Sequence, residues 1–301
     1  MQTMSDIRKA ILENPSIVLQ LEDPTEELLL LAVHTDPQII NHLEDIPESV
    51  QMYVVSRHPE YILNIANPTV NVQMTAVDID ERYIFCISDP SIEAQKAAVF
   101  ADPSLIQRLE NMPLEVIELA LATDPFCIAY IKDPTPAMYE LALSKNGDVI
   151  RAIKNPSNHL KELAIKQYPF AIKYMKNPSV ELQLLAVHEN TNALKYIQNP
   201  YPEVQIWAVS HNKQAVGHIA IPCEEAQLIA VEGSPESITH VVNPTPKVQM
   251  RAVQQDPESV KCILRPCDEV QKHVISVDPT LLHLIRNPTE EVQLMAKLMI
   301  T

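Results

Sequence analysis

The chain contains few of the residues on which phosphate, metal and redox sites depend. Its 301 residues include only three glycines, Gly147, Gly217 and Gly233, which are isolated and cannot form a phosphate-binding loop. The five cysteines are odd in number and form no CxxC pair, so the sequence indicates neither a disulfide framework nor a zinc site. Its ten histidines form no HExxH or HxxxH spacing. We therefore expect no cofactor, no metal and no enzymatic activity.

Long apolar runs are also missing. The longest, Leu28 to Val33, is far shorter than the roughly 20 residues that span a bilayer. The first residues carry Asp6, Arg8 and Glu13 instead of the apolar core of a signal peptide. We expect a cytoplasmic protein with no membrane segment.

Proline, in contrast, is abundant and periodic. It occupies 11 of 13 positions spaced 22 residues apart, and Ile46 and Met112 occupy the other two, each followed by proline. The periodic prolines are Pro24, Pro68, Pro90, Pro134, Pro156, Pro178, Pro200, Pro222, Pro244, Pro266 and Pro288. Such a period predicts a solenoid of stacked units instead of a globule with one central core.

Each 22-residue unit has the pattern of two helices. Eight residues after the register position stands alanine, replaced only by Val54 and Val274, which indicates closely approaching helices. Ser or Thr follows the register position in eight units and is expected to cap the first helix. A second proline, usually preceded by Asp, begins a helix of about seven residues, short enough to be 3₁₀.

The register predicts one elongated all-α domain over residues 1–301. Residues 1–22 form an N-terminal cap and partial repeat, residues 23–286 form twelve full repeats, and residues 287–301 form a C-terminal half repeat. No linker or low-complexity segment interrupts the pattern between residues 23 and 296.

Segments such as Asn177–Val187 resemble the leucine-rich repeat variant and related short helical repeats of bacterial and large-phage proteins. The resemblance covers nearly the whole chain. It implies a right-handed α-solenoid of about 13 helix-pair repeats whose role is binding, and it implies no catalytic residue. The chain departs from that family in its shorter unit and in having no cysteine cluster ahead of the repeats.

A glutamine recurs five residues after the register position in nine of the 13 units. This position falls within the apolar arc of the first helix, so we expect the side chain to be buried. A buried amide needs partners, and the nearest are backbone groups of the proline turns. We interpret the row as a structural ladder between neighbouring units. A row of ligand-binding amides is the alternative.

Charge is distributed unevenly. Residues 1–150 contain 8 Lys and Arg against 24 Asp and Glu, whereas residues 151–301 contain 15 of each. Net charge of −16 disfavours binding to nucleic acid, which requires clustered cations. Part of the acid is expected to cap helices, as at Asp36, Asp45, Asp102 and Asp124. The alternative is an acidic face for a basic partner or a mimic of nucleic-acid charge.

One candidate binding site emerges from the second helices. Positions 14, 17 and 18 of successive units bring together aromatic and cationic side chains, which we call the aromatic–cationic stripe. It comprises Phe126, Tyr130, Arg151, Phe170, Lys173, Tyr174, Lys195, Tyr196, His218 and His240. Such a stripe suits an acidic peptide, a phosphorylated segment or a stacked nucleotide. The alternative is that the tyrosines only cover the helix while the lysines solvate it.

The leading hypothesis is a noncatalytic scaffold or inhibitor that binds a protein over several repeats. The second hypothesis is binding or sequestration of a small phosphorylated or nucleotide ligand by the stripe. Apolar residues in the last helix predict self-association or partner contact there; they are Leu294, Met295, Leu298, Met299 and Ile300. The only tryptophan, Trp207, is expected to pack in the core.

Overall fold

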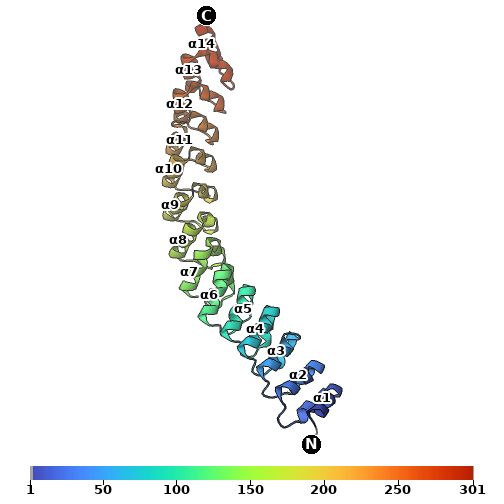
Figure 1. Cartoon of the computed structure of the whole chain (residues 1–301). Helices are drawn as coiled ribbons and strands as arrows, with labels where there is room; N and C mark the ends of the chain where they lie inside the picture. Colours follow the sequence, from blue (N-terminus) through green and yellow to red (C-terminus); the bar gives the residue numbers. More distant parts are fainter. Residues whose placement is uncertain (1–2, 301) are drawn as a thin grey trace. The chain divides into compact units, whose positions relative to one another are not determined.

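A computed structural model describes residues 3–300, and these residues confirm the all-α solenoid. Fourteen α-helices alternate with 13 short 3₁₀ helices, and the described residues contain no strand (Figure 1). The chain divides into two compact units, Met1–Lys145 and Asn146–Thr301, each of which is described by itself.

The first unit contains seven α-helices and six 3₁₀ helices, the latter named η. Their bounds are α1 Met4–Glu13, η1 Pro15–Gln20, α2 Glu26–Thr35, η2 Pro37–His42, α3 Glu48–Val55, η3 Pro59–Asn64, α4 Val70–Ile79, η4 Glu81–Cys86, α5 Ile92–Ala101, η5 Pro103–Gln107, α6 Leu114–Thr123, η6 Pro125–Tyr130 and α7 Pro136–Lys145. The second unit contains η7 Gly147–Ala152, α8 Asn158–Gln167, η8 Pro169–Tyr174, α9 Val180–Glu189, η9 Thr191–Tyr196, α10 Pro202–His211, η10 Lys213–His218, α11 Glu224–Val231, η11 Pro235–His240, α12 Pro246–Gln255, η12 Pro257–Cys262, α13 Asp268–Val277, η13 Pro279–Leu284 and α14 Glu290–Ile300.

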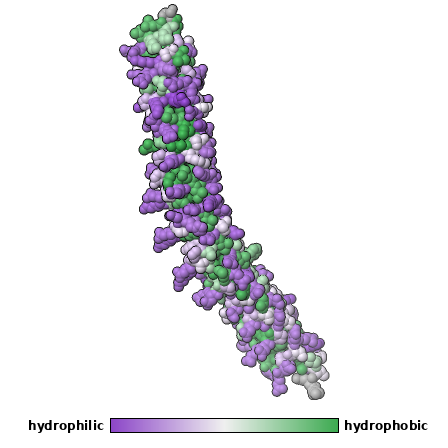
Figure 2. All heavy atoms as spheres, turned by 90° about the vertical axis from the view of Figure 1, so that its left-hand side faces the viewer, coloured by the Kyte–Doolittle hydropathy of each residue, from purple (hydrophilic) through white to green (hydrophobic). Residues whose placement is uncertain are grey.

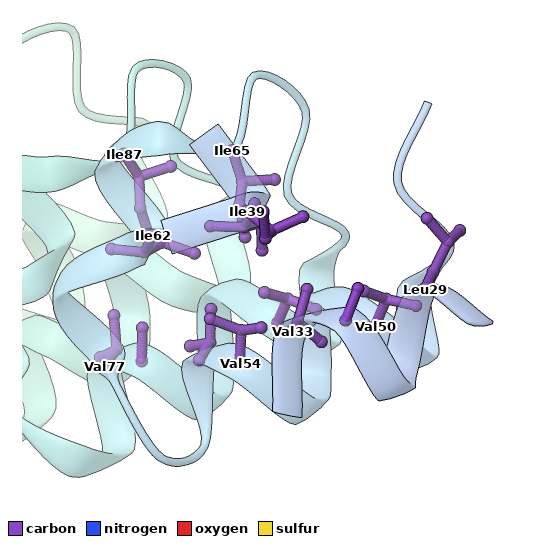
Figure 3. Close-up of a cluster of buried hydrophobic side chains, with 14 of the residues drawn as sticks. Leu29, Val33, Ile39, Val50, Val54, Ile62, Ile65, Val77 and Ile87 are labelled. Carbon is purple, nitrogen blue, oxygen red and sulfur yellow. The ribbon is translucent and has the colours of Figure 1, made fainter. Parts of the chain in front are cut away.

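Within each unit the α-helices form one layer, since each contacts the next α-helix, and the 3₁₀ helices form the other, in which most contact the next 3₁₀ helix. The core lies between the two layers. Figure 3 shows this arrangement in the first unit, where Ile39 and Ile62 of the 3₁₀ layer lie over Val33, Val54 and Val77 of the α layer. Each repeat therefore shields only its neighbours, as expected of a solenoid.

The alanine of the α layer occupies the closest approach between helices. Ten of these alanines, from Ala32 to Ala252, are fully buried, and Ala296 is 1% exposed. A larger side chain there would push adjacent helices apart or force strained rotamers. The sequence prediction of closely packed helices is confirmed.

The second helix of each 22-residue repeat is 3₁₀ along its whole length. Twelve of the 13 contain six residues and η5 contains five. In most repeats an Asp or Asn directly before the 3₁₀ helix accepts a hydrogen bond from the backbone N–H two residues later, as Asp36, Asp102 and Asp124 do. The predicted capping role of these three residues is confirmed. Short helices of this kind leave much of their backbone dependent on caps.

The Asn or Asp before the register position has a different role. Asp45, Asn111, Asp133, Asn155, Asn177, Asn243 and Asn287 adopt positive φ values between 48° and 56°. Asn and Asp tolerate this left-handed region better than other residues with a Cβ atom. At Asp45 the expected helix cap is therefore wrong, because the residue forms the left-handed turn that precedes the cap. In the eight repeats that have Ser or Thr after the register position, this residue directly precedes the α-helix, and Ser91, Ser157 and Thr245 cap the helix through their hydroxyls.

The recurrent glutamines form the predicted ladder. Gln205 is 6% exposed; its Nε2 donates to the carbonyl of Pro200 (2.8 Å), and its Oε1 accepts from the backbone N–H of Cys223 in the next repeat (2.7 Å). The same pair of bonds recurs at Gln51, Gln73, Gln183, Gln227, Gln249 and Gln271. Each such glutamine joins two repeats through buried backbone groups.

The ladder stops at Gln95. Its Nε2 donates to the carbonyl of Pro90, but its Oε1 is buried without a hydrogen-bond partner. The residue at the donor position is Pro113, which has no N–H. Leu29 occupies the glutamine position in the one other repeat that is followed by proline at this donor position, Pro47. The chemistry of the next repeat therefore determines whether a glutamine can be satisfied.

Candidate functional site

The structure places the ten predicted residues of the aromatic–cationic stripe in two units. Phe126 and Tyr130 lie on η6 of the first unit, where Tyr130 is 47% exposed. The other eight lie on η7 to η11 of the second unit. In the second unit consecutive 3₁₀ helices contact each other, so the eight residues lie along one layer.

Lys173 of η8 lies at the centre of a group of aromatic rings. Its Nζ is 4.7 Å from the ring centroid of Tyr174, 5.4 Å from that of Tyr168 and 5.9 Å from that of Tyr196. Ammonium groups within about 6 Å of a ring centroid are attracted by its π face. Hydrogen bonding to Tyr174 and the neighbouring tyrosines and Asp148 raise the pKa of Lys173, so the cation is retained at neutral pH.

Phe170 holds two of these rings in place. It makes edge-to-face contacts with Tyr168 (5.4 Å between centroids, 80° between planes) and with Tyr196 of the next repeat (5.5 Å, 65°). Such geometry is favoured by the quadrupoles of the rings. Tyr174 and Tyr196 nevertheless remain 39% and 47% exposed, so the group presents open aromatic surface to a ligand.

Asp148 of η7 is the one carboxylate in this region. Its Oδ2 lies 3.7 Å from Nε of Arg151, and its Oδ1 lies 3.9 Å from Nζ of Lys173. Oδ1 is buried without a hydrogen bond, because an ion pair of that length is too long to be one. At Oδ1, Asp148 therefore interacts with Lys173 through charge alone.

Two adjoining clefts border the group. One of about 610 Å³ lies between two repeats and is lined by Lys173, Tyr174, Lys176, Tyr196 and Tyr201, together with the polar side chains of Asn177, Gln183, Gln198 and Asn199. The other, of about 510 Å³, is lined by Arg151, Lys161, Tyr174 and Lys176. Tyr174 and Lys176 line both clefts, so they form the wall between them.

The surface around the clefts is cationic. The 3₁₀ helices η7 to η9 and the turns that follow them, residues 147–156, 169–178 and 191–200, contain Arg151, Lys154, Lys173, Lys176 and Lys195, against the single carboxylate of Asp148. All five cations are exposed. The arrangement favours an anionic ligand of extended shape.

His218 and His240 continue the stripe along η10 and η11. Burial, followed by the nearby positive charges of Lys195 and His240, lowers the pKa of His218 below 6.5. At neutral pH this ring is uncharged. His218 therefore extends the stripe beyond the lysines of η7–η9 as a neutral ring.

Sequence reasoning missed Tyr168, Lys176, Asp148 and Tyr201. Tyr168 stands where most repeats place the Asp or Asn cap of the 3₁₀ helix, and η8 accordingly has no side-chain cap. Gly147 provides the space for it, since a Cβ atom at residue 147 would meet Cβ of Tyr168 at 2.8 Å and the carbonyl oxygen of Ala164 at a still shorter distance. The missing cap at residue 168 and the glycine at 147 were the signals in the sequence.

Trp207 corrects one prediction. It is not part of the buried core but lies half-buried on the outer face of α10, stacked on His211 (3.8 Å between centroids, 20°) and close to His188 (4.1 Å, 34°). Its position, seven residues after Pro200, is on the outer side of the helix, next to the buried Ala208. Because its neighbours Ile206, Ala208 and Val209 are apolar, the sequence pattern did not distinguish this outer position from a core position.

The remaining predicted positions are distributed as follows. On α14, Leu294, Leu298, Met299 and Ile300 are exposed, and Met295 packs against the core.

All five cysteines are free thiols, and burial is the main cause that raises the pKa of Cys127 to about 12. Within residues 3–300, no group of three or more His, Cys, Asp or Glu could hold a metal ion. In the same range, no helix is long and apolar enough to cross a lipid bilayer.

No known family model matches this sequence, and no curated protein is significantly similar to it.

Proposed function

We propose that the protein is a noncatalytic scaffold that binds an acidic segment of another protein along η7–η10 of its second unit. The observation that supports this proposal is the position of Lys173 among Tyr168, Tyr174 and Tyr196, beside a cleft of about 610 Å³. Aromatic anchors with adjoining cations are typical of the energetically important centres of protein interfaces.

The extent of the surface favours a macromolecular partner. The exposed cations run over three successive repeats, from Arg151 to Lys195. An interface of ordinary size takes about 800 Å² from each partner, which requires several repeats of such a narrow solenoid. Carboxylates of the partner would pair with the lysines, while its apolar groups would contact the tyrosine rings.

A small phosphorylated ligand is the second candidate, and a specific observation favours it. The larger cleft brings Lys173, Lys176 and the rings of Tyr174 and Tyr196 together within two repeats, which is the convergence that a nucleotide pocket requires. A thermal-shift panel of nucleotides distinguishes the candidates. A ligand at 100 times its dissociation constant stabilises the folded state by about 2.7 kcal/mol, whereas a peptide-binding surface gives no response to the panel.

The primary test is fluorescence anisotropy with a labelled 12-residue peptide of alternating Glu and Asp, titrated with the whole protein at low salt. We expect saturable binding that the double variant Lys173→Glu, Lys195→Glu weakens at least tenfold, because two attractive charges become repulsive. A peptide of alternating Gln and Asn should not bind.

The matched control is the double variant Lys247→Glu, Lys272→Glu. It changes the net charge by the same amount, but both lysines lie on α-helices of the second unit, where they pair with Glu224 and Glu291. Affinity should stay within about twofold of the wild type. Equal weakening by both double variants would attribute binding to net charge alone and would reject the stripe as the site.

A further inference from the structure

The α layer of the second unit carries an apolar surface that the aromatic–cationic stripe does not use. The half-buried residues on the outer faces of α9 to α12, which we call the α-face patch, are Leu184, Leu185, Ile206, Trp207, Leu228, Ile229 and Met250. Figure 2 faces this layer and shows hydrophobic side chains gathered between hydrophilic margins along the upper part of the molecule. The patch spans four consecutive repeats.

Charged residues define the extent of the patch. Six residues after the register position, α9 to α12 have Leu184, Ile206, Leu228 and Met250, whereas α8 has Glu162 and α13 has Lys272. Helices in contact are about 9 Å apart, so four of them span about 30 Å. An α-helix of about 20 residues has this length at a rise of about 1.5 Å per residue.

Trp207 occupies the middle of the patch. Its indole lies between the rings of His188 on α9 and His211 on its own helix, and the backbone carbonyl of residue 207 is 2.8 Å from Nδ1 of His211. These contacts fix the orientation of the ring while it remains partly exposed. Tryptophan is among the residues enriched at the energetically dominant centres of protein interfaces.

The patch also has a recess. A cleft of about 670 Å³ between α11 and α12 is lined by Leu228 and Met250, with Glu232, Lys247, Arg251 and Glu269 around them. A partner's large apolar side chain could enter it while the rest of the partner lies over Trp207. Apolar recesses of this kind determine the register of a docked helix.

Charge indicates the chemistry of the partner. Helices α9 to α11 contain five glutamates, Glu181, Glu189, Glu203, Glu224 and Glu225, and no Lys or Arg. The two cations of α12, Lys247 and Arg251, pair with Glu224 and Glu232. Glu181, Glu203 and Glu225 occupy equivalent, exposed positions in the first turn of each helix, so they form an acidic row beside the apolar residues. The opposite layer of the same repeats carries the cations of η8 and η9.

From this geometry we infer that the α-face patch of α9–α12 binds an amphipathic helix, apolar on one face and with Lys or Arg along one flank. The apolar face of that helix covers Trp207 and enters the recess at Leu228 and Met250. Its cations pair with the row formed by Glu181, Glu203 and Glu225. This partner differs in charge from the acidic segment proposed for η7–η10, so the two surfaces select different molecules.

Selection from a peptide library tests the inference. The library displays 20-residue helical peptides with a fixed leucine stripe and randomised flanks, and the bait is the whole protein. We expect selected peptides enriched in Lys and Arg on one flank. Because Trp207 is the only tryptophan, its fluorescence should shift and saturate when a selected peptide binds.

Two variants locate the site. Ile229→Glu places a charge in the half-buried patch and should weaken the selected peptides at least tenfold, with helix content unchanged by circular dichroism. Lys173→Glu, on the other layer, should leave their affinity within twofold. The inference is overturned if no peptide is selected, if the selected flanks are acidic or random, or if Ile229→Glu binds as the wild type does. The conservative variant Ile229→Val retains binding if the loss arises from charge and not from altered folding.

Discussion

The two units share one core and differ at the surface. Both bury alanines between α-helices and alternate α-helices with 3₁₀ helices. Residues 1–145 carry 8 Lys and Arg against 23 Asp and Glu, a net charge of −15, whereas residues 146–301 carry 15 against 16, a net charge of −1. Since both units bury the same kind of core, the charge difference between them lies at their surfaces.

Part of this charge difference has a structural origin. In the first unit four 3₁₀ helices are capped by Asp (Asp36, Asp80, Asp102 and Asp124) and one by Asn14. In the second unit three are capped by Asn (Asn146, Asn190 and Asn212) and two by Asp256 and Asp278. Either side chain can accept the same hydrogen bond from the backbone. The cations of η7–η9 are not among the side chains that cap the 3₁₀ helices, so capping does not explain why they gather there.

The glutamine ladder is also distributed unevenly along the chain. Repeats from Gln183 onward carry it without interruption to Thr289, whereas the repeats with Ile117, Tyr139 and Lys161 at the glutamine position have none. The boundary between the two units, at Lys145 and Asn146, falls within the part that has no rung. Cohesion between repeats is therefore uneven along the sequence.

The largest expected effect comes from breaking a rung. In the first unit, Gln73→Ala leaves the N–H of Ser91 and the carbonyl of Pro68 without their partner, at about 1–3 kcal/mol for each buried group. Gln95→Ala creates a similar cavity but removes only one hydrogen bond and an oxygen that already has no partner. Urea denaturation followed by circular dichroism should show a larger loss for Gln73→Ala by about 1–2 kcal/mol. Equal losses would mean that the rung contributes nothing, and an unchanged midpoint for Gln205→Ala would reject the ladder in the second unit.

Gly147→Ala should have the next largest effect. The new Cβ atom would overlap the backbone of α8 and lie 2.8 Å from Cβ of Tyr168. We expect a loss of about 1–3 kcal/mol in the free energy of unfolding together with weaker binding of the acidic peptide, because Tyr168 must move away from Lys173. The control is Gly217→Ala, whose nearest contact would be a tolerable 3.3 Å to Cβ of His240. Similar behaviour of the two variants would show that Tyr168 does not depend on Gly147.

Changing the caps of the first unit tests whether their carboxylates are needed only for capping hydrogen bonds or also for their charge. Replacing Asp36, Asp102 and Asp124 together by Asn preserves the capping hydrogen bonds, so the melting temperature should change little although the net charge rises by three. Replacing the same residues by Ala should cost about 1 kcal/mol at each position. A marked loss of stability in the Asn variant would show that charge, and not hydrogen bonding, is what the caps provide.

The smallest effect concerns His218. Its lowered pKa means that the folded state favours the neutral ring, so its contribution to stability is complete above pH 6.5 and is lost as the pH falls below that value. Proton NMR of the ring should give a midpoint below 6.5. In Lys195→Gln the midpoint should rise only in part, because burial is the larger cause. A midpoint at or above 6.5 in the wild type would contradict the described environment.

Much of the fold could be predicted from the sequence because period and capping chemistry are local. The Pro register located each repeat, Ala32 and its equivalents predicted the helix contacts, and the glutamine ladder followed from burial. The left-handed turn at Asp45 was misread as a cap, since an Asp before a helix suits both roles. Tyr168 was missed because its contact with Lys173 depends on the packing of side chains between repeats, and Trp207 because an outer position on a helix with apolar neighbours resembles a core position.

The most direct test of the central proposal is an NMR titration of the labelled whole protein with the acidic 12-residue peptide. We expect chemical-shift changes in the backbone amides of η7 to η10, strongest around Lys173 and Tyr196, with the amides of α9 to α12 and of the first unit unchanged. Changes centred on the α-helices or on the first unit, or no changes at saturating peptide, would contradict the proposal.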